Sequence, residues 1–213
     1  MKKFLLVLIA SLLLSLTACG SSNKKEESSI VQDASVIEKT ESKALIVYFS
    51  RTGEQYGVGI IEKGNTAIVA EMIADYTGAD LYEVEPVKDY PRTYDALTDV
   101  AKEEQNKNER PKIKGDLPDL SGYDTIFIGS PVWWGDWPMI MYTYFEANDF
   151  SGKTLIPFST HGGSGLSGFD TKLKKAAPGA KVLEGIGIYG EDCQNDADNV
   201  RTDVTEWLMK LGF

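Results

Sequence analysis

The sequence predicts an α/β fold in which helices cover both faces of a single, mostly parallel sheet of five strands. Three continuous apolar runs, at residues 44–49, 125–129 and 154–159, have the composition of central strands that are buried on both faces. Two shorter strands are expected at residues 80–85 and 181–189. Helical segments separate the strands, and this alternation favours a doubly wound sheet with right-handed crossovers.

The helices are predicted from apolar residues at helical spacing and from start and stop signals. Residues 66–76 carry such a stripe and are followed by Gly78, a residue suited to a helix C-terminus. A weaker apolar stripe predicts a helix over residues 95–107. The remaining predicted helices span residues 139–147 (after Pro138), 169–176 (before a Pro-Gly pair) and 196–211 (amphipathic).

The first 18 residues are expected to be a leader. Lys2 and Lys3 precede an apolar run, residues 4–16, that is too short to span a bilayer. The Leu-Thr-Ala-Cys segment that ends at Cys19 is similar to the lipobox of bacterial lipoproteins. The resemblance implies a signal peptide over residues 1–18, lipidation of Cys19 and anchoring at the extracytoplasmic face of a bacterial cell envelope. A plain secretory leader is the alternative.

Composition separates a tether from the domain. Residues 19–42 are polar and lack aromatic side chains, so a disordered tether is expected there, followed by one domain over residues 43–213. The formal net charge of −10 argues against nucleic-acid binding and leaves the lipid anchor as the only expected membrane attachment. One histidine and two cysteines, without ligand spacing, predict no metal site.

The loop after the first apolar strand is a candidate anion site. Ligands of open α/β sheets bind at the carboxyl ends of the strands, where hydroxyls and free N–H groups at a helix N-terminus can hold phosphate. Asn65 or Thr66 could instead serve only as a helix cap. Ser50, Thr52, Asn65 and Thr66 can each donate to phosphate oxygen. The candidate cofactor-binding residues of this loop are Ser50, Arg51, Thr52, Gly53, Asn65 and Thr66.

The loops after the other two apolar strands carry aromatic residues and glycines. Adjacent Trp133 and Trp134 cannot both face one way along an extended chain, so at least one is expected to face the crevice and to stack on a flat ring. The glycines of the third loop let the backbone approach a ligand closely. The candidate residues are Pro131, Val132, Trp133, Trp134 and Gly135, followed by Thr160, His161, Gly162, Gly163, Ser164 and Gly165.

The three loops, in this order, resemble those of the flavodoxins. Residues 50–53 and 64–66 match the two halves of the flavodoxin phosphate loop, but residues 54–64 are inserted between the halves. We expect the insertion to bulge away and to leave the halves adjacent. The resemblance implies a flavodoxin-like doubly wound sheet of strand order 2-1-3-4-5, and FMN as the cofactor.

The function implied by the resemblance is FMN-dependent electron transfer at a membrane surface. The expected partner is a redox protein or a small-molecule electron acceptor. The protein is expected to be a monomer. The alternative on the same fold is an NAD(P)H-dependent FMN or quinone reductase; the lack of a GxGxxG fingerprint slightly favours the carrier. Two weaker alternatives are a hydrolase that uses Ser164 and His161, and a lipoprotein without redox function. No side chain is expected to be catalytic, because FMN carries the chemistry.

Overall fold

The computed structural model describes residues 43–213, so the predicted signal peptide, the tether and Cys19 lie outside the described residues. All strands of the main sheet are parallel, and the predicted order 2-1-3-4-5 is confirmed. The fifth strand is divided into two pieces that both pair with the fourth. In spatial order the strands are β4 (Asp80–Glu83), β1 (Lys43–Tyr48), β5 (Tyr123–Pro131), β6 (Thr154–His161), and then β7 (Lys181–Val182) and β8 (Ile186–Tyr189).

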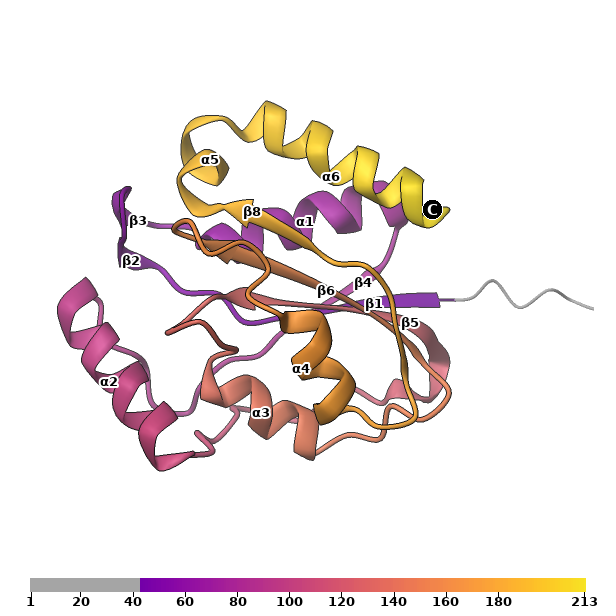
Figure 1. Ribbon diagram of the computed structural model, residues 1–213, viewed down its shortest axis with the longest axis horizontal. Coiled ribbons are helices and arrows are strands. Elements are labelled where there is room, and N and C mark those ends of the chain that lie inside the picture. Colours follow the sequence, from indigo (N-terminus) through magenta and orange to yellow (C-terminus); the bar gives the residue numbers. More distant parts are fainter. Residues whose placement is uncertain (1–42) are drawn as a thin grey trace, which may run out of the picture. The chain divides into compact units, whose positions relative to one another are not determined.

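Helices cover both faces of this sheet, as Figure 1 shows. One face is covered by α1 (Asn65–Thr77), α5 (Gly190–Asn195) and α6 (Ala197–Leu211). The other is covered by α3 (Met139–Glu146) and α4 (Phe169–Ala176), with α2 (Tyr94–Lys107) beside α3; the single turn η1 (Leu120–Gly122) precedes β5. Within residues 43–213 no helix is long and apolar enough to cross a bilayer.

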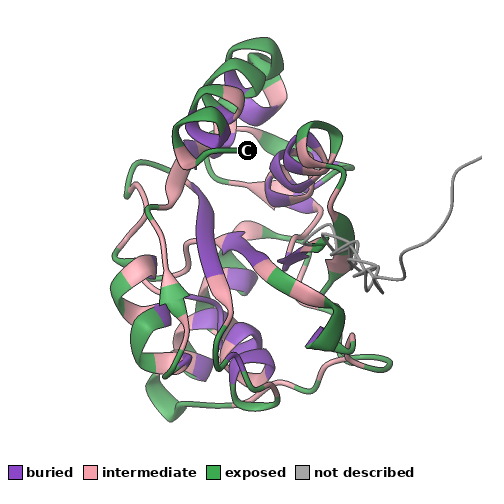
Figure 2. Ribbon diagram, turned by 90° about the vertical axis from the view of Figure 1, so that its right-hand side faces the viewer, coloured by how far each residue is buried: buried purple, intermediate pink, exposed green. Residues whose placement is uncertain are grey.

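The core is divided into two layers because side chains alternate across the strands. In β1 and the residue after it, Leu45, Val47 and Phe49 pack toward α3 and α4, whereas Ile46 and Tyr48 pack toward α1 and α6. The central strands are accordingly buried along most of their length (Figure 2). This burial on both faces is why these strands appear in the sequence as unbroken apolar runs.

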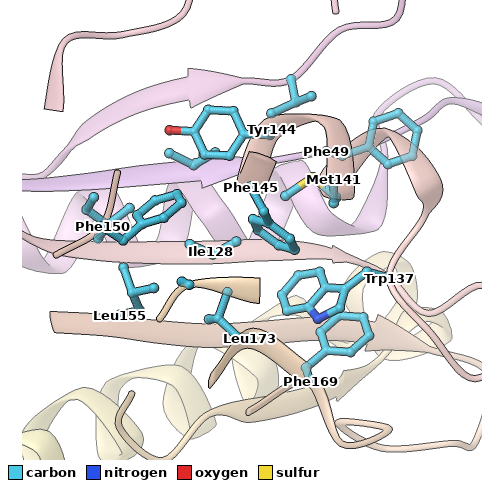
Figure 3. Packing of buried hydrophobic residues seen from close by; sticks show 14 of the residues in the cluster. Phe49, Ile128, Trp137, Met141, Tyr144, Phe145, Phe150, Leu155, Phe169 and Leu173 are labelled. Carbon is cyan, nitrogen blue, oxygen red and sulfur yellow. The ribbon is translucent and has the colours of Figure 1, made fainter. Parts of the chain in front are cut away.

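The layer beneath α3 and α4 is rich in aromatic side chains. The rings of Trp137 and Phe169 stack with centroids 3.6 Å apart and an interplanar angle of 17°, and Phe145 meets Trp137 edge to face (Figure 3). Both members of the stack are buried. The stack joins the start of α4 to the segment that leads into α3, and so fixes the loop between β5 and α3 on the core.

Two predicted boundaries depend on single residues. Gly78 ends α1 in the left-handed conformation, with φ of 69°, and donates its N–H to the carbonyl of Ala74, as its position in the sequence predicted. The predicted strand over residues 181–189 is interrupted opposite Pro157, which has no N–H to donate to a neighbouring strand. There Gly185 approaches so closely that a β-carbon on it would lie 2.3 Å from the carbonyl oxygen of Pro157.

Two elements were not expected. The inserted segment between the two halves of the first loop forms an antiparallel hairpin, β2 (Gly53–Gln55) and β3 (Gly59–Ile61). The short helix α5 lies between β8 and α6, where no helix or strand was predicted. In Figure 1 the hairpin stands at the end of the sheet where β1, β5 and β6 terminate.

Candidate functional site

A cavity of about 460 Å³ lies at the carboxyl ends of β1, β5 and β6, where the three predicted loops meet. The hairpin, α2 and the start of α5 complete its wall. Its size lies within the range of pockets that hold small molecules and cofactors. The lining residues are Ser50, Arg51, Gln55, Tyr56, Asn65, Thr66, Tyr94, Leu97, Thr98, Ala101, Pro131, Val132, Trp133, Trp134, Gly135, Thr160, His161, Gly162, Ser164 and Gly190.

The two halves of the first loop are adjacent despite the insertion. Ser50 Oγ accepts a hydrogen bond from the backbone N–H of Ala67 at 3.1 Å, and thereby caps α1 from the preceding strand. A β-carbon on Gly64 would lie 2.1 Å from Ser50 Oγ, so only glycine fits between the halves. The N–H groups of Asn65 and Thr66, in the first turn of α1, have no partner within the helix and can bind an anion.

The side chains at the start of α1 are held by neighbouring elements. The Oδ1 atom of Asn65 accepts a hydrogen bond from Gln194 Nε2 at 2.7 Å, which leaves the amide NH₂ of Asn65 as a donor. The hydroxyls of Thr66 and Thr160 are 2.8 Å apart, and both residues are buried. This pair connects the helix to the end of β6, directly beneath the cavity.

Arg51 is bound by backbone carbonyls. Its guanidinium donates to the carbonyl of Glu54 at 2.8 Å, to that of Pro91 at 3.1 Å and to that of Arg92 at 2.9 Å. Burial, and then the charge of Arg92, lower the pKa of Arg51. Arg51 therefore braces the base of the hairpin against residues 91–92, although it also lines the cavity.

Thr52 and Gly53 do not line this cavity. Thr52 faces a neighbouring polar hollow on the β4 side of the loop. Gly53 begins β2 with φ of 91°, and a β-carbon there would lie 2.6 Å from the carbonyl oxygen of Arg92. The glycine is thus required by the close approach of the hairpin to residue 92, and the predicted phosphate contact of Thr52 is not supported by its position.

The inserted hairpin does not bulge away, and this corrects the expectation from sequence. Its tip folds back so that Tyr56 lines the cavity and covers Gly162 of the third loop; a β-carbon on Gly162 would lie 2.8 Å from Tyr56 Cδ1. The Tyr56 and Tyr94 rings lie 6.0 Å apart. Residues 59–61 pair with residues 53–55, so the insertion forms a small sheet of its own. This sheet packs against the site.

The second loop begins with a tight turn. Trp133 and Asp136 exchange two backbone hydrogen bonds of 3.0 Å, and φ is 51° at Trp134 and 72° at Gly135. Positive φ at both central residues defines a type I′ turn, which is unusual for a tryptophan. Lys172 holds the turn from α4 by donating to the carbonyl of Gly135 and pairing with Asp136.

The two adjacent indoles line different parts of the cavity wall. Trp133 packs edge to face on Phe49 and Tyr90, with centroids 5.3 Å and 4.9 Å away. Trp134, 53% exposed, donates its indole N–H to the carbonyl of Thr98 in α2 at 2.9 Å. Both residues line the cavity, where at least one indole was expected to face the crevice, and the stacking of an indole on a flat ring stays a prediction.

The third loop contributes Thr160, His161, Gly162 and Ser164 to the cavity, whereas Gly163 and Gly165 lie outside its lining. His161 Nδ1 accepts a hydrogen bond from the N–H of Gly163 at 3.0 Å. Burial lowers the pKa of His161, and a hydrogen bond with the backbone of Gly187 opposes this shift in part, so the neutral imidazole is favoured. Within residues 43–213 no hydrogen bond joins His161 to Ser164, and the arrangement lacks the Ser–His contact that a hydrolase requires.

Several residues that line the cavity were not predicted from the sequence. Those of α2 occur at helical spacing, but the weak apolar stripe predicted only a helix and did not indicate that one face of it would line the cavity. Nothing in the sequence indicated that the hairpin tip or the start of α5 would reach the cavity. The missed residues are Gln55, Tyr56, Tyr94, Leu97, Thr98, Ala101 and Gly190. Within residues 43–213 no group of three or more His, Cys, Asp or Glu side chains is placed to hold a metal ion.

The fold and the cavity define a doubly wound α/β protein in which a helix N-terminus and an aromatic wall meet at the ends of the strands. The chain belongs to the flavodoxin family, whose model matches residues 43–210. No curated protein matches the chain significantly.

Solved structures give the same result. A candidate flavoprotein from Bacteroides uniformis ATCC 8492 is 31% identical, with a TM-score of 0.61; the match covers 79% of this chain and 98% of that chain. A second, from Bacteroides eggerthii DSM 20697, is 32% identical, with a TM-score of 0.59 and coverage of 75% and 98%. A flavoprotein from Lactobacillus acidophilus NCFM, solved in complex with FMN, is 24% identical, with a TM-score of 0.55 and coverage of 73% and 97%, and shows the shared fold.

Proposed function

We propose that this protein binds FMN in the cavity and carries electrons at a membrane surface, to which lipidated Cys19 attaches it. The observation that carries the proposal is the presence, in one cavity, of a helix N-terminus that suits an anion and of two tryptophans that can contact a flat ring. FMN contains both of the matching groups, a terminal phosphate and a tricyclic ring. The flavoprotein from Lactobacillus acidophilus, which was solved with FMN, supports the same cofactor.

The residues of the cavity divide by the part of FMN that they suit. The free N–H groups at the start of α1 and the amide NH₂ of Asn65 suit the phosphate, since the helix dipole and unpaired donors both favour an anion. Trp133, Trp134 and Leu97 offer apolar surface to the ring. When bound, FMN supplies one- or two-electron transfer, while the chain holds and orients it and shields it from water.

We favour a carrier over a reductase. No side chain of the cavity is required as an acid, base or nucleophile, because bound FMN would carry the chemistry, and within residues 43–213 no hydrogen bond joins His161 to Ser164. The acidic chain, with a formal net charge of −10, would steer basic partner proteins toward its surface. A redox partner protein is therefore the proposed donor or acceptor.

The cofactor and the carrier role are tested together. The full-length protein, purified in detergent, is expected to be yellow and to release FMN, identified by chromatography, on denaturation. The bound FMN should be reduced slowly by NAD(P)H alone and quickly when a flavoprotein reductase is added. Rapid reduction by NAD(P)H alone would instead identify a reductase, and a colourless protein that does not take up FMN would refute the proposal.

The membrane attachment is tested separately. The Cys19→Ala variant should remain unprocessed or leave the membrane fraction, as cell fractionation would measure, and should bind FMN as the parent does. The two properties are expected to separate because Cys19 precedes the flavodoxin domain by more than 20 residues. Membrane association that persists after normal processing of the variant would contradict the lipid anchor.

A further inference from the structure

The third loop has no Phe, Tyr or Trp between Thr160 and Gly168, yet a tyrosine ring covers it. Tyr56, at the tip of the inserted hairpin, lies against Gly162 so closely that a β-carbon on Gly162 would be 2.8 Å from its ring. The same tyrosine lines the cavity and is 62% exposed. A large aromatic residue that is held in place but left uncovered has a face available for a ligand.

The hairpin is fixed at its base. Arg51 binds the carbonyls of Glu54 and of residues 91–92, while the N–H of Glu54 donates to the carbonyl of Arg92 at 2.8 Å. Glu54 Oε2 accepts from the N–H of Tyr94, in the first turn of α2, at 2.8 Å. These contacts place the tip over the cavity beside Tyr94, whose ring lies 6.0 Å from that of Tyr56.

The two aromatic groups come from different strand ends. Trp133 follows β5 and packs on Phe49 and Tyr90, whereas Tyr56 is seated on the loop that follows β6. In Figure 1 the hairpin stands at the strand ends, with α5 on one side of it and α2 on the other. A flat ring in the cavity that Tyr56 and Trp133 both line would therefore be within reach of the tryptophan turn and of the hairpin tip.

We infer that Tyr56 is the second aromatic wall of the ring site, and that the inserted hairpin serves to bring it there. The inference rests on the proposed function, since it assigns Tyr56 to the isoalloxazine ring of FMN. The hairpin thereby gives the third loop, which has no Phe, Tyr or Trp of its own, an aromatic cover. Arg51 and Glu54 are positioning residues, because they hold the base of the hairpin.

The test measures FMN and riboflavin dissociation constants for the full-length protein in detergent. Tyr56→Ala should weaken both ligands by the same factor, roughly three- to thirtyfold, because the lost contact is with the ring that they share. Tyr56→Phe should restore binding, and Tyr56→Leu should restore it only in part. Ile60→Ala is the matched control: this residue lies on the same hairpin, is 75% exposed and does not line the cavity.

The outcomes separate this inference from the proposed function. If the parent binds FMN and Tyr56→Ala binds both ligands as tightly, Tyr56 is a surface residue and the inference fails alone. A loss for FMN without a loss for riboflavin would place Tyr56 at the phosphate and would also overturn the inference. If the parent binds neither ligand, the proposed function itself fails. Melting curves of Tyr56→Leu and Ile60→Ala check that the hairpin variants fold.

Discussion

The hydroxyl oxygens of Thr66 and Thr160 lie 2.8 Å apart in a buried contact that joins the start of α1 to the end of β6. The two residues are 94 positions apart in the chain, and both line the cavity. Because Asn65 and Thr66, in the first turn of α1, line the same cavity, this contact sets the position of the candidate anion site relative to the third loop.

The contact is expected to behave as a coupled pair. Thr66→Val or Thr160→Val alone leaves a buried hydroxyl without a partner, which should lower the free energy of unfolding by about 1–3 kcal/mol. The double variant should lose less than the sum of the two single losses, since it removes both hydroxyls. Urea denaturation of the four proteins measures the coupling; additive losses would show that the hydroxyls do not interact.

A second prediction separates the two halves of the phosphate loop. Asn65→Ala should weaken FMN by roughly three- to thirtyfold and leave riboflavin unchanged, because the amide of Asn65 suits the phosphate. Thr52→Ala should change neither constant, since Thr52 faces the neighbouring hollow. If fluorescence titration shows that Thr52→Ala loses affinity for FMN but not for riboflavin, Thr52 binds the phosphate as the sequence predicted, and this prediction is wrong.

A third prediction distinguishes the two tryptophans. Trp134→Ala should weaken FMN and riboflavin equally, by about 1–2 kcal/mol, with little effect on the melting temperature, because the indole is largely exposed. Trp133→Ala should weaken both ligands and also destabilise the fold, since it packs on Phe49 and Tyr90. Should both variants keep the parent's flavin affinity, the tryptophan turn is not part of the ring site.

A fourth prediction follows from the pKa of His161, which burial lowers. The unfolded chain, with an ordinary histidine pKa of about 6.5, then binds a proton more readily than the folded protein. The stability that neutral His161 contributes is present above that pKa and is lost as the pH falls below it. The unfolding free energy of the parent minus that of His161→Gln should therefore fall from pH 7.5 to pH 5.5. A rise in this difference would contradict a lowered pKa of His161.

Much of the fold could be predicted because parallel central strands are buried on both faces. Ile126, Phe127 and Ile128 form an unbroken apolar run for that reason, and the helices that cover the sheet carry stripes of apolar residues. The division of the last strand could not be predicted, since it depends on which strand lies opposite Pro157. The short helix α5 contains mostly polar residues and gave no periodic signal.

The site was predictable only where it follows directly from strand ends. Ser50, Trp133 and His161 come within two residues of a strand or at its end, so their loops had to converge. Tyr56 and Tyr94 reach the cavity through the packing of a hairpin on a helix, a tertiary contact that no local pattern specifies. Because no local pattern specifies this contact, the sequence did not indicate that the insertion would fold over the cavity, and the expectation that it bulges away was wrong.

The most direct test of the central claim is a titration of the flavin-free protein with FMN and with riboflavin, followed by flavin fluorescence. We expect one FMN to bind per chain with strong quenching of its fluorescence. Riboflavin should bind roughly ten- to a hundredfold more weakly, because it lacks the phosphate that the start of α1 would hold. Equal affinity for the two flavins, or no quenching by either, would contradict the central claim.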